Sequence, residues 1–454
     1  MILLSGCSGW RLWPLSNEAR SKQFLQLLQN EQREHESMIQ RVYRQLCEAG
    51  LSGRISVVTS AAQADAIRNQ IGTDIEVILE PERRDTFPAA AVAATHLFYE
   101  SRVNPEETVL VLPVDTYVDS EYFEQLVCLD DAIQKGAADI LLMGTSPTYP
   151  SAKYGYIIPG ENLFVAGNGA SCRTVASYVE KPSEKEAEQL LQKGALWNTG
   201  VFAFRLGFLM EYLKKYTSAT SMEEFFEDFA KLPAKSFDYE MLDSHANPEP
   251  HARLAVVPYI GKWKDLGTWN TLTEEMSENN IGFARQGEEC ENTHVINELS
   301  IPVLVLGAKD MVVAASPDGI LVSDKHKSSY IKPYVQEIGS RPMYEERRWG
   351  EYKVLDYNQY DDENKSLTKH LTIRAGKSIS YQKHNHRDEI WTIVDGVGEL
   401  LIDGHVRNVR RGDVAYIVKG QLHAMRAVTD LQFIEVQIGP ELSEDDIERF
   451  VWEW

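Results

Sequence analysis

The first 270 residues alternate short apolar runs with longer segments in which apolar residues recur at helical spacing. The short runs predict strands at residues 2–4, 55–59, 76–79, 109–112 and 140–144. The spacing between them predicts helices at 38–49, 61–70 and 88–99. Pro88 suits the first turn of the last of these helices. Strands that alternate with helices favour the α/β class, with a mostly parallel sheet covered on both faces, like a Rossmann fold.

The pattern changes after Trp269, where helical spacing gives way to short apolar runs between tight turns. Runs at 303–306, 311–314 and 320–322 predict a small β-rich, β-helix-like connector. Farther on, strand-length runs and glycine-containing turns predict an antiparallel β-barrel, with strands at 371–373, 390–394, 399–402, 414–417 and 433–437. We therefore predict three domains, at residues 1–285, 286–340 and 341–454.

Composition places the chain among ordinary globular proteins and narrows its partners. Of 454 residues, 68 are acidic and 46 are Lys or Arg, which gives a net charge of -22. Such a charge repels phosphate backbones and anionic lipid, so we expect neither a nucleic-acid nor a membrane partner. A small anionic ligand held by a few local cations stays compatible with it. The five scattered cysteines, and the lack of any apolar run near the roughly 18 residues of a membrane span, favour the cytoplasm.

The strand at residues 2–4 leads directly into a loop of small residues that ends on a cation, Ser5-Gly6-Cys7-Ser8-Gly9-Trp10-Arg11. Backbone N–H groups of such a loop can approach a polyphosphate, and Arg11 and Lys22 add positive charge. The nucleotide-binding candidates in it are Ser5, Gly6, Ser8 and Gly9. By itself, a loop of this kind fits a tight strand exit equally well.

Two carboxylates are candidates for a magnesium site. Asp115 follows a buried strand, where an open α/β sheet binds its ligands, and Asp265 lies in a second Gly-rich stretch. Mg²⁺ prefers oxygen ligands and bridges phosphates, so two carboxylates and a triphosphate would suit it. The alternative is that Asp115 caps a turn and Asp265 is a loop residue.

A histidine-rich segment near the C-terminus predicts a divalent transition-metal site. On a strand, Gln382, His384 and His386 would share one face because side chains alternate. Glu389 has the opposite parity and reaches them only if the chain bends after His386. His423 comes from another predicted strand. Imidazoles and a carboxylate suit a metal such as Zn²⁺, whereas the alternative is that the histidines are exposed strand residues.

Together these stretches resemble known families. The run from Leu4 to Ser16, followed by Lys22-Gln-Phe-Leu25, resembles the signature of mannose-1-phosphate guanylyltransferases. Further blocks of that family follow in order, at 79–81, 112–115, 154–156, 179–182, 196–200 and 264–269. The stretch 382–391 and the approach Arg347-Arg-Trp-Gly350 resemble the cupin half of type II mannose-6-phosphate isomerases.

The first resemblance implies a reaction of GTP with mannose 1-phosphate that yields GDP-mannose and pyrophosphate, without a protein nucleophile. It also implies residue roles. Arg11 and Lys22 would neutralise the triphosphate, Glu80 and Pro88 would lie near the base, Gly155, Glu180 and Asn198 would hold the sugar, Lys181 would bind its phosphate, and Asp115 and Asp265 would hold Mg²⁺.

The second resemblance implies interconversion of mannose 6-phosphate and fructose 6-phosphate, with Arg387 at the substrate phosphate or in proton transfer. The sequence departs from the family patterns at Cys7, Trp10, Asp85, Ser21, Val418 and Ala427. Two alternatives therefore stay open. One is a transferase of another sugar 1-phosphate with a non-catalytic cupin, and the other is a non-catalytic sensor of nucleotide sugars. The sequence leaves a homo-oligomer open as well.

Overall fold

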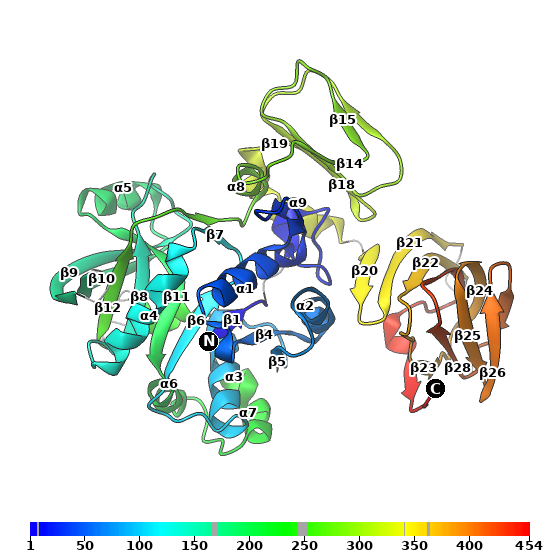
Figure 1. Ribbon diagram of the computed structural model, residues 1–454, viewed down its shortest axis with the longest axis horizontal. Helices are drawn as coiled ribbons and strands as arrows, with labels where there is room; N and C mark the ends of the chain where they lie inside the picture. The colour runs from blue at the N-terminus through cyan, green and yellow to red at the C-terminus, as the bar shows by residue number, and fades with distance from the viewer. Residues whose placement is uncertain (7–8, 166–170, 244–251, 340, 361–363) are drawn as a thin grey trace. The chain divides into compact units, whose positions relative to one another are not determined.

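The computed structural model describes residues 1–454 apart from 7–8, 166–170, 244–251, 340 and 361–363. The chain forms two compact units (Figure 1). One contains Met1–Ser8 and Ser21–Ser277, and the other contains Gly9–Arg20 and Glu278–Trp454. The short segment 9–20 therefore groups with the C-terminal half of the chain, and the three domain boundaries given above stay predictions. Among the described residues, no helix has the length and apolarity needed to cross a membrane.

The first unit is built on a nine-stranded sheet, which confirms the α/β class. In spatial order its strands are β5 (Glu76–Glu80), β4 (Ser56–Ser60), β1 (Ile2–Leu4), β6 (Thr108–Pro113), β11 (Leu196–Arg205), β8 (Ile140–Thr145), β12 (Leu254–Tyr259), β10 (Ser171–Glu180) and β9 (Gly155–Val165). The first four strands pair in parallel, as do β12 and β8. β11 is antiparallel to both β6 and β8. The parallel strands β5, β4, β1 and β6 therefore end at one edge.

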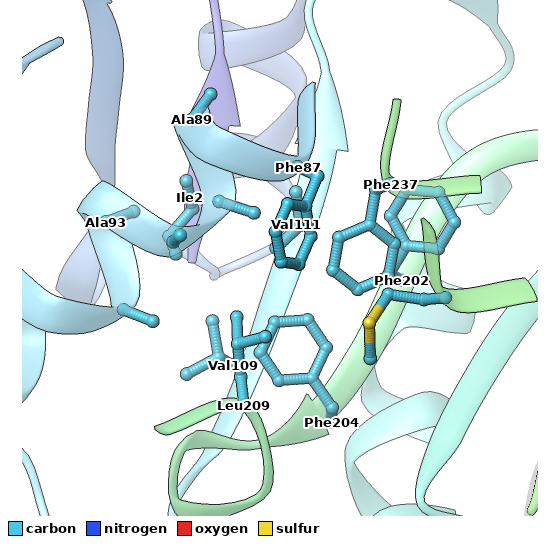
Figure 2. Close-up of a cluster of buried hydrophobic side chains, with 14 of the residues drawn as sticks. Ile2, Phe87, Ala89, Ala93, Val109, Val111, Phe202, Phe204, Leu209 and Phe237 are labelled. Carbon is cyan, nitrogen blue, oxygen red and sulfur yellow. The ribbon is translucent and has the colours of Figure 1, made fainter. Parts of the chain in front are cut away.

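Helices cover both faces of this sheet, as the alternation of side chains along the strands requires. Ile2 and Leu4 belong to a core with α3 (Thr86–Tyr99), α6 (Leu206–Leu213) and α7 (Met222–Asp228). Figure 2 shows the aromatic rings Phe87, Phe204 and Phe237 in this core. Leu3 belongs to the opposite core, with α1 (Met38–Glu48), α2 (Ala64–Ile71) and α4 (Glu121–Gln134). This unit also contains α5 (Glu184–Gln192) and α8 (Trp269–Thr273).

Two helix starts differ from the predicted ones, and local capping explains the first. α3 begins at Thr86 rather than at Pro88, since the Asp85 side chain accepts a hydrogen bond from the Thr86 backbone N–H. The predicted helix at 61–70 divides into a 3-10 turn at Ala61–Gln63 and α2. The helix predicted at 38–49 is α1, which a capping box between Ser37 and Gln40 starts.

The second unit begins with the β-rich connector. β14 (Asn280–Gly282), β16 (His294–Asn297) and β18 (Met311–Ser316) pair in parallel, and β15 (Ala284–Gln286) pairs in parallel with β17 (Val303–Val305). Parallel pairing of such short successive strands is typical of a β-helix. β19 (Gly319–Asp324) closes the connector as a hairpin with β18, and α9 (Lys332–Ile338) follows.

The C-terminal part, which we call the C-terminal β domain, consists of two antiparallel sheets. The six-stranded sheet has the order β20 (Tyr344–Arg347), β21 (Gly350–Gln359), β22 (Lys365–Ile373), β29 (Leu431–Gly439), β24 (Asp388–Asp395) and β27 (Val414–Ile417). The five-stranded sheet has the order β26 (His405–Arg410), β25 (Val397–Ile402), β28 (His423–Ala427), β23 (Tyr381–Lys383) and β30 (Glu448–Phe450). Residues of both sheets, among them Trp391 and Met425, share one buried core.

Candidate functional site

The carboxyl ends of β1 and β5 bring the predicted loop next to a buried carboxyl. Ser5 follows β1, and its carbonyl accepts a hydrogen bond of 2.8 Å from the Gln23 side chain. A Cβ atom on Gly6 would lie 2.5 Å from Oε1 of Glu80, so a larger residue at this position would require the Glu80 carboxyl to move. Burial raises the pKa of Glu80 to about 7. Gly6 and Glu80, both predicted nucleotide contacts, are therefore neighbours.

The other predicted nucleotide contacts stay predictions. Ser8, like Cys7, is outside the described residues. Gly9 and Arg11 belong to a 3-10 turn, Gly9–Leu12, in the segment that groups with the second unit, and Arg11 is exposed there. Pro88 is buried in the first turns of α3.

The carboxyl end of β6 carries the predicted magnesium ligand Asp115 together with a buried cation. Lys22, which is 5% exposed, places its Nζ 2.5 Å from Oδ2 of Asp115. β7 (Thr116–Val118) pairs with β13 (Trp263–Asp265), and this pairing sets Asp265 opposite Thr116. Burial raises the pKa of Tyr154, and the charges of Asp265 and, less strongly, Asp115 raise it further. Asp265 therefore ends β13, Asp115 directly precedes the strand β7 that pairs with it, and both carboxylates act on the same phenol.

A second polar group joins three of the predicted sugar-binding residues. The Tyr178 hydroxyl lies 2.7 Å from Oε2 of Glu180, and Nδ2 of Asn198 donates to that hydroxyl at 3.1 Å. A Cβ atom on Gly155 would overlap with the same hydroxyl. The backbone of β9 therefore closes over the group in a way that requires glycine.

Asp238 completes this group and was not predicted from the sequence. Its Oδ1 accepts a hydrogen bond of 2.6 Å from Nδ2 of Asn198 and lies 3.0 Å from the Tyr178 hydroxyl. Burial raises the pKa of Asp238, and the nearby charge of Glu180 raises it further. Tyr178 could have been found, because it lies two residues before Glu180 on one strand and so shares its face. No motif marks Asp238.

Lys181 lies at the edge of this group. Its Nζ is 3.0 Å from Oε1 of Glu180, its side chain is about half exposed, and its backbone adopts a left-handed conformation. The backbone N–H of Lys181 donates to the carbonyl of Tyr154 at 3.2 Å. This bond connects the polar group around Glu180 with Tyr154, which directly precedes β9.

In the C-terminal β domain, three of the five predicted metal ligands come together. Nε2 of His384 lies 3.1 Å from Oε1 of Glu389, and Nε2 of His423 lies 3.5 Å from Oε2 of the same carboxylate. Ligand atoms of all three side chains lie within 4.8 Å of one another, and all three residues are buried. The chain bends at residues 385–386, not after His386 as predicted, and Glu389 lies on the side of His384.

Hydrogen bonds at the far side of each imidazole orient the ring for metal binding. Nδ1 of His384 contacts the carbonyl of Asp446 at 3.2 Å, and Nδ1 of His423 contacts the carbonyl of Gln421 at 2.9 Å. A carbonyl only accepts, so each Nδ1 carries a hydrogen, and in the neutral form of the ring Nε2 presents a lone pair. The buried Nε2 of His423 makes no hydrogen bond to the described residues, and burial lowers the pKa of this imidazole. These features fit a bound divalent cation.

The expectation that His386 shares this face is wrong. β23 ends at Lys383, so the alternation of side chains does not continue to His386. The His386 side chain is 52% exposed, and its Nδ1 lies 2.9 Å from Oδ1 of Asp446. Gln382 lies at the margin of the cluster, with its Nε2 3.5 Å from Nε2 of His384.

Arg387 is buried beside the cluster. Its Nε donates to Oε1 of Glu389 at 2.9 Å, and its Nη2 lies 3.3 Å from Nε2 of His384. Trp391 adds a hydrogen bond of 3.1 Å to Oε2 of Glu389. The Glu389 carboxylate is thus held by fixed donors. Burial would raise the pKa of Glu389, but its neighbours His384, His423 and Arg387 lower it below its usual value.

Comparison with known proteins finds similarity in both halves of the chain. Residues 1–280 match the family model of nucleotidyl transferases, and residues 340–451 match that of the mannose-6-phosphate isomerase C-terminal domain. The alginate biosynthesis protein AlgA of Pseudomonas putida is 31% identical over 482 residues, which cover 99% of this chain and 95% of that protein. The mannose-1-phosphate guanylyltransferase of Escherichia coli is 30% identical, with coverage of 99% and 97%.

A solved structure is similar as well. The crystal structure described as mannose-1-phosphate geranyltransferase from Thermus thermophilus has a TM-score of 0.59 and 28% sequence identity. It covers 75% of this chain and 98% of its own.

Proposed function

Since this chain belongs to the nucleotidyl transferase family and carries the C-terminal domain of the mannose-6-phosphate isomerase family, we propose that it makes GDP-mannose from GTP and mannose 1-phosphate. The observation that carries the proposal is the ion pair of the buried Lys22 with the half-buried Asp115, beside Asp265, at the carboxyl end of a central strand. Ligands of open α/β sheets bind at such an edge. The polar group around Glu180 and Asn198 supplies acceptors and donors for sugar hydroxyls.

In the proposed reaction, a phosphate oxygen of mannose 1-phosphate attacks the α-phosphorus of GTP. The new P–O bond forms as the bond to the bridging oxygen of the β-phosphate breaks, and pyrophosphate leaves with that electron pair. Lys22 and Arg11 neutralise the triphosphate, and Lys181 holds the sugar phosphate. Such residues act by orientation and by stabilisation of charge, and no protein nucleophile is needed.

Asp115 and Asp265 would hold Mg²⁺ in this site. Their carboxylates suit the ion because it prefers oxygen ligands, and Asp115 already binds one cation, Lys22. When bound, Mg²⁺ would supply positive charge between the phosphates.

We also propose a second activity in the C-terminal β domain, the interconversion of mannose 6-phosphate and fructose 6-phosphate. His384, Glu389 and His423 would hold a divalent metal, for which Zn²⁺ is the first candidate. When bound, the ion would polarise the sugar oxygens during proton transfer between neighbouring carbons. Both sets of substrates are small molecules, and we propose that the protein acts on them in the cytoplasm.

The first test is pyrophosphate release on mixing the protein with GTP, mannose 1-phosphate and Mg²⁺. Parallel reactions with UTP or with glucose 1-phosphate measure the selectivity for base and sugar. Separate assays follow the formation of fructose 6-phosphate from mannose 6-phosphate after loading with Zn²⁺, Co²⁺ or Mn²⁺. If GTP binds but no pyrophosphate is released with any sugar 1-phosphate, the transferase proposal fails.

A further inference from the structure

We propose that the C-terminal β domain contains an anion pocket, formed by Lys369 and Arg387, that binds the phosphate group of its sugar phosphate, and that Glu444 fills this pocket before substrate enters. The inference rests on the proposed isomerase function for the identity of the ligand. Its geometry is independent of that function.

Lys369 is the fixed cation of the pocket. It lies on β22, is 3% exposed, and places its Nζ 2.6 Å from Oε1 of Glu444. Its ammonium group also lies 4.4 Å from the centre of the Tyr352 ring. A buried ammonium group is costly without an anionic partner, so the site requires a negative charge at this point.

Glu444 supplies that negative charge. It begins the 3-10 turn Glu444–Asp446, close to the end of the chain, and its side chain is 38% exposed, compared with 4% for Lys369. If Glu444 moves out, its carboxylate returns to water, whereas Lys369 stays buried on its strand. Another anion can therefore replace Glu444 without opening the core.

Arg387 links this pocket to the candidate metal cluster. While its Nε donates to Glu389, its Nη1 donates to the carbonyl of Ser443 at 2.7 Å. One guanidinium group thus touches both the cluster and the turn that carries Glu444. A ligand with reactive oxygens at one end and an anion at the other matches this arrangement, and a hexose 6-phosphate is such a ligand.

The local charges favour an anion stronger than one carboxylate. Burial alone would raise the pKa of Glu444, but Lys369, Arg387 and Arg347 together lower it below its usual value. Three cations therefore act on the position of this single charge, and a phosphate dianion carries more charge and more acceptor oxygens. Glu435, the cross-strand neighbour of Lys369, contacts Trp391 and Gln437.

The experiment compares phosphate binding and isomerase kinetics in the zinc-loaded full-length protein. Calorimetry with inorganic phosphate measures the pocket directly, and the KM for mannose 6-phosphate measures it during turnover. We expect Glu444→Gln to tighten phosphate binding and to lower the KM, each about tenfold, because the competing carboxylate is removed. Lys369→Met should weaken both by at least about tenfold. Glu441→Gln, an exposed carboxylate in the same segment, should change neither.

The test is decisive because the two substitutions should change phosphate binding in opposite directions. If Glu444→Gln weakens phosphate binding, or if it leaves both constants unchanged, the pocket is disproved. This holds even where Lys369→Met fails to fold, because Glu444→Gln removes no buried cation. Phosphate binding that follows these signs without any turnover supports the pocket and disproves the isomerase. If the protein turns over mannose 6-phosphate but the variants leave the phosphate affinity and the KM unchanged, the isomerase is supported and the pocket is disproved.

Discussion

Buried carboxyl groups with raised pKa values occur at both ends of the candidate transferase site, and each gives a test at the level of one residue. Glu80 lies beside the loop at Gly6, and Asp238 lies among Tyr178, Glu180 and Asn198. Burial is the largest cause of the shift in both. A carboxyl that stays protonated near neutral pH can donate a hydrogen bond, which a carboxylate cannot.

For Asp238, we expect Asp238→Asn to retain function and Asp238→Ala to lose it. An asparagine Oδ1 can still accept from Asn198, and its neutral side chain resembles the protonated acid. The KM for mannose 1-phosphate should change less than about threefold in Asp238→Asn and rise about tenfold or more in Asp238→Ala, which removes the nearer of the two acceptors of the Asn198 amide. The KM for GTP should stay constant in both. Equal losses in the two variants would show that the charged form of Asp238 is required.

For Glu80, the raised pKa makes the stability of the first unit depend on pH. The folded carboxyl titrates at about 7 and the unfolded one near 4.5. Between these values the unfolded state binds fewer protons, so the free energy of unfolding falls as the pH rises from 4.5 to 7. We expect Glu80→Gln to remove this fall. At pH 8 the variant should therefore unfold at a higher urea concentration than the wild type, with a free energy of unfolding that is roughly 1–3 kcal/mol larger.

The measurement for Glu80 is a series of urea denaturation curves at pH 5 and pH 8. Glu82→Gln is the matched control, because Glu82 is an exposed carboxylate two residues away. If the curves of Glu80→Gln and wild type shift in parallel between the two pH values, Glu80 titrates normally in the folded protein.

At the level of elements, the end of β23 decides which histidines meet. The period of two along a strand predicted a common face for Gln382, His384 and His386, but the strand stops at Lys383. The residue spacing correctly identified His384, Glu389 and His423 as a cluster. It could not show where the ladder ends, because that depends on the pairing with β28 and β30.

The histidines therefore differ in their expected effect on metal binding. His384→Ala or His423→Ala should each remove the bound divalent ion, whereas His386→Ala should keep it, because His386 contacts Asp446 at the surface. Metal content by mass spectrometry after loading and gel filtration gives the result, with one ion per chain expected in the wild type. Loss of the ion in His386→Ala alone would contradict the assigned cluster.

The connector has its own role, because it holds the segment that follows the candidate phosphate loop. Nδ2 of Asn17 donates to Oδ2 of Asp318 at 2.8 Å, and the Ser316 hydroxyl donates to the carbonyl of Pro14 at 2.6 Å. A Cβ atom on Gly319 would lie 2.5 Å from the Trp13 ring. The β18–β19 turn thus fixes residues 13–17 by direct contact.

We expect Asp318→Ala to raise the KM for GTP several-fold, because the segment that carries Arg11 loses an anchor. The KM for mannose 6-phosphate should not change. Steady-state kinetics of both activities give the answer. Asp324→Ala, at the far end of the same hairpin, is the control, since Asp324 bonds only to the following backbone among the described side-chain contacts. An unchanged KM for GTP would show that the loop is fixed without the connector.

At the scale of the whole molecule, the sequence predicted layers and local motifs better than long-range contacts. Apolar periodicity located β1, β4, β5, β6 and β8 to within a few residues, because each strand forms its own local pattern. The net charge of -22 was likewise compatible with a nucleotide ligand, because a single cation such as Lys22 is buried near the carboxyl end of β6. Asp238 and the contacts of segment 9–20 have no local signature, because they depend on residues far away along the chain.

The contact between Asn17 and Asp318 also has a consequence for synthesis on the ribosome. The two residues are 301 positions apart in the chain. At about 5–20 residues per second, Asn17 leaves the ribosome roughly 15–60 s before its partner is made. During this interval the nascent chain lacks the β18–β19 turn that fixes residues 13–17. Residues 13–17 are therefore translated well before the turn that supplies their native contacts.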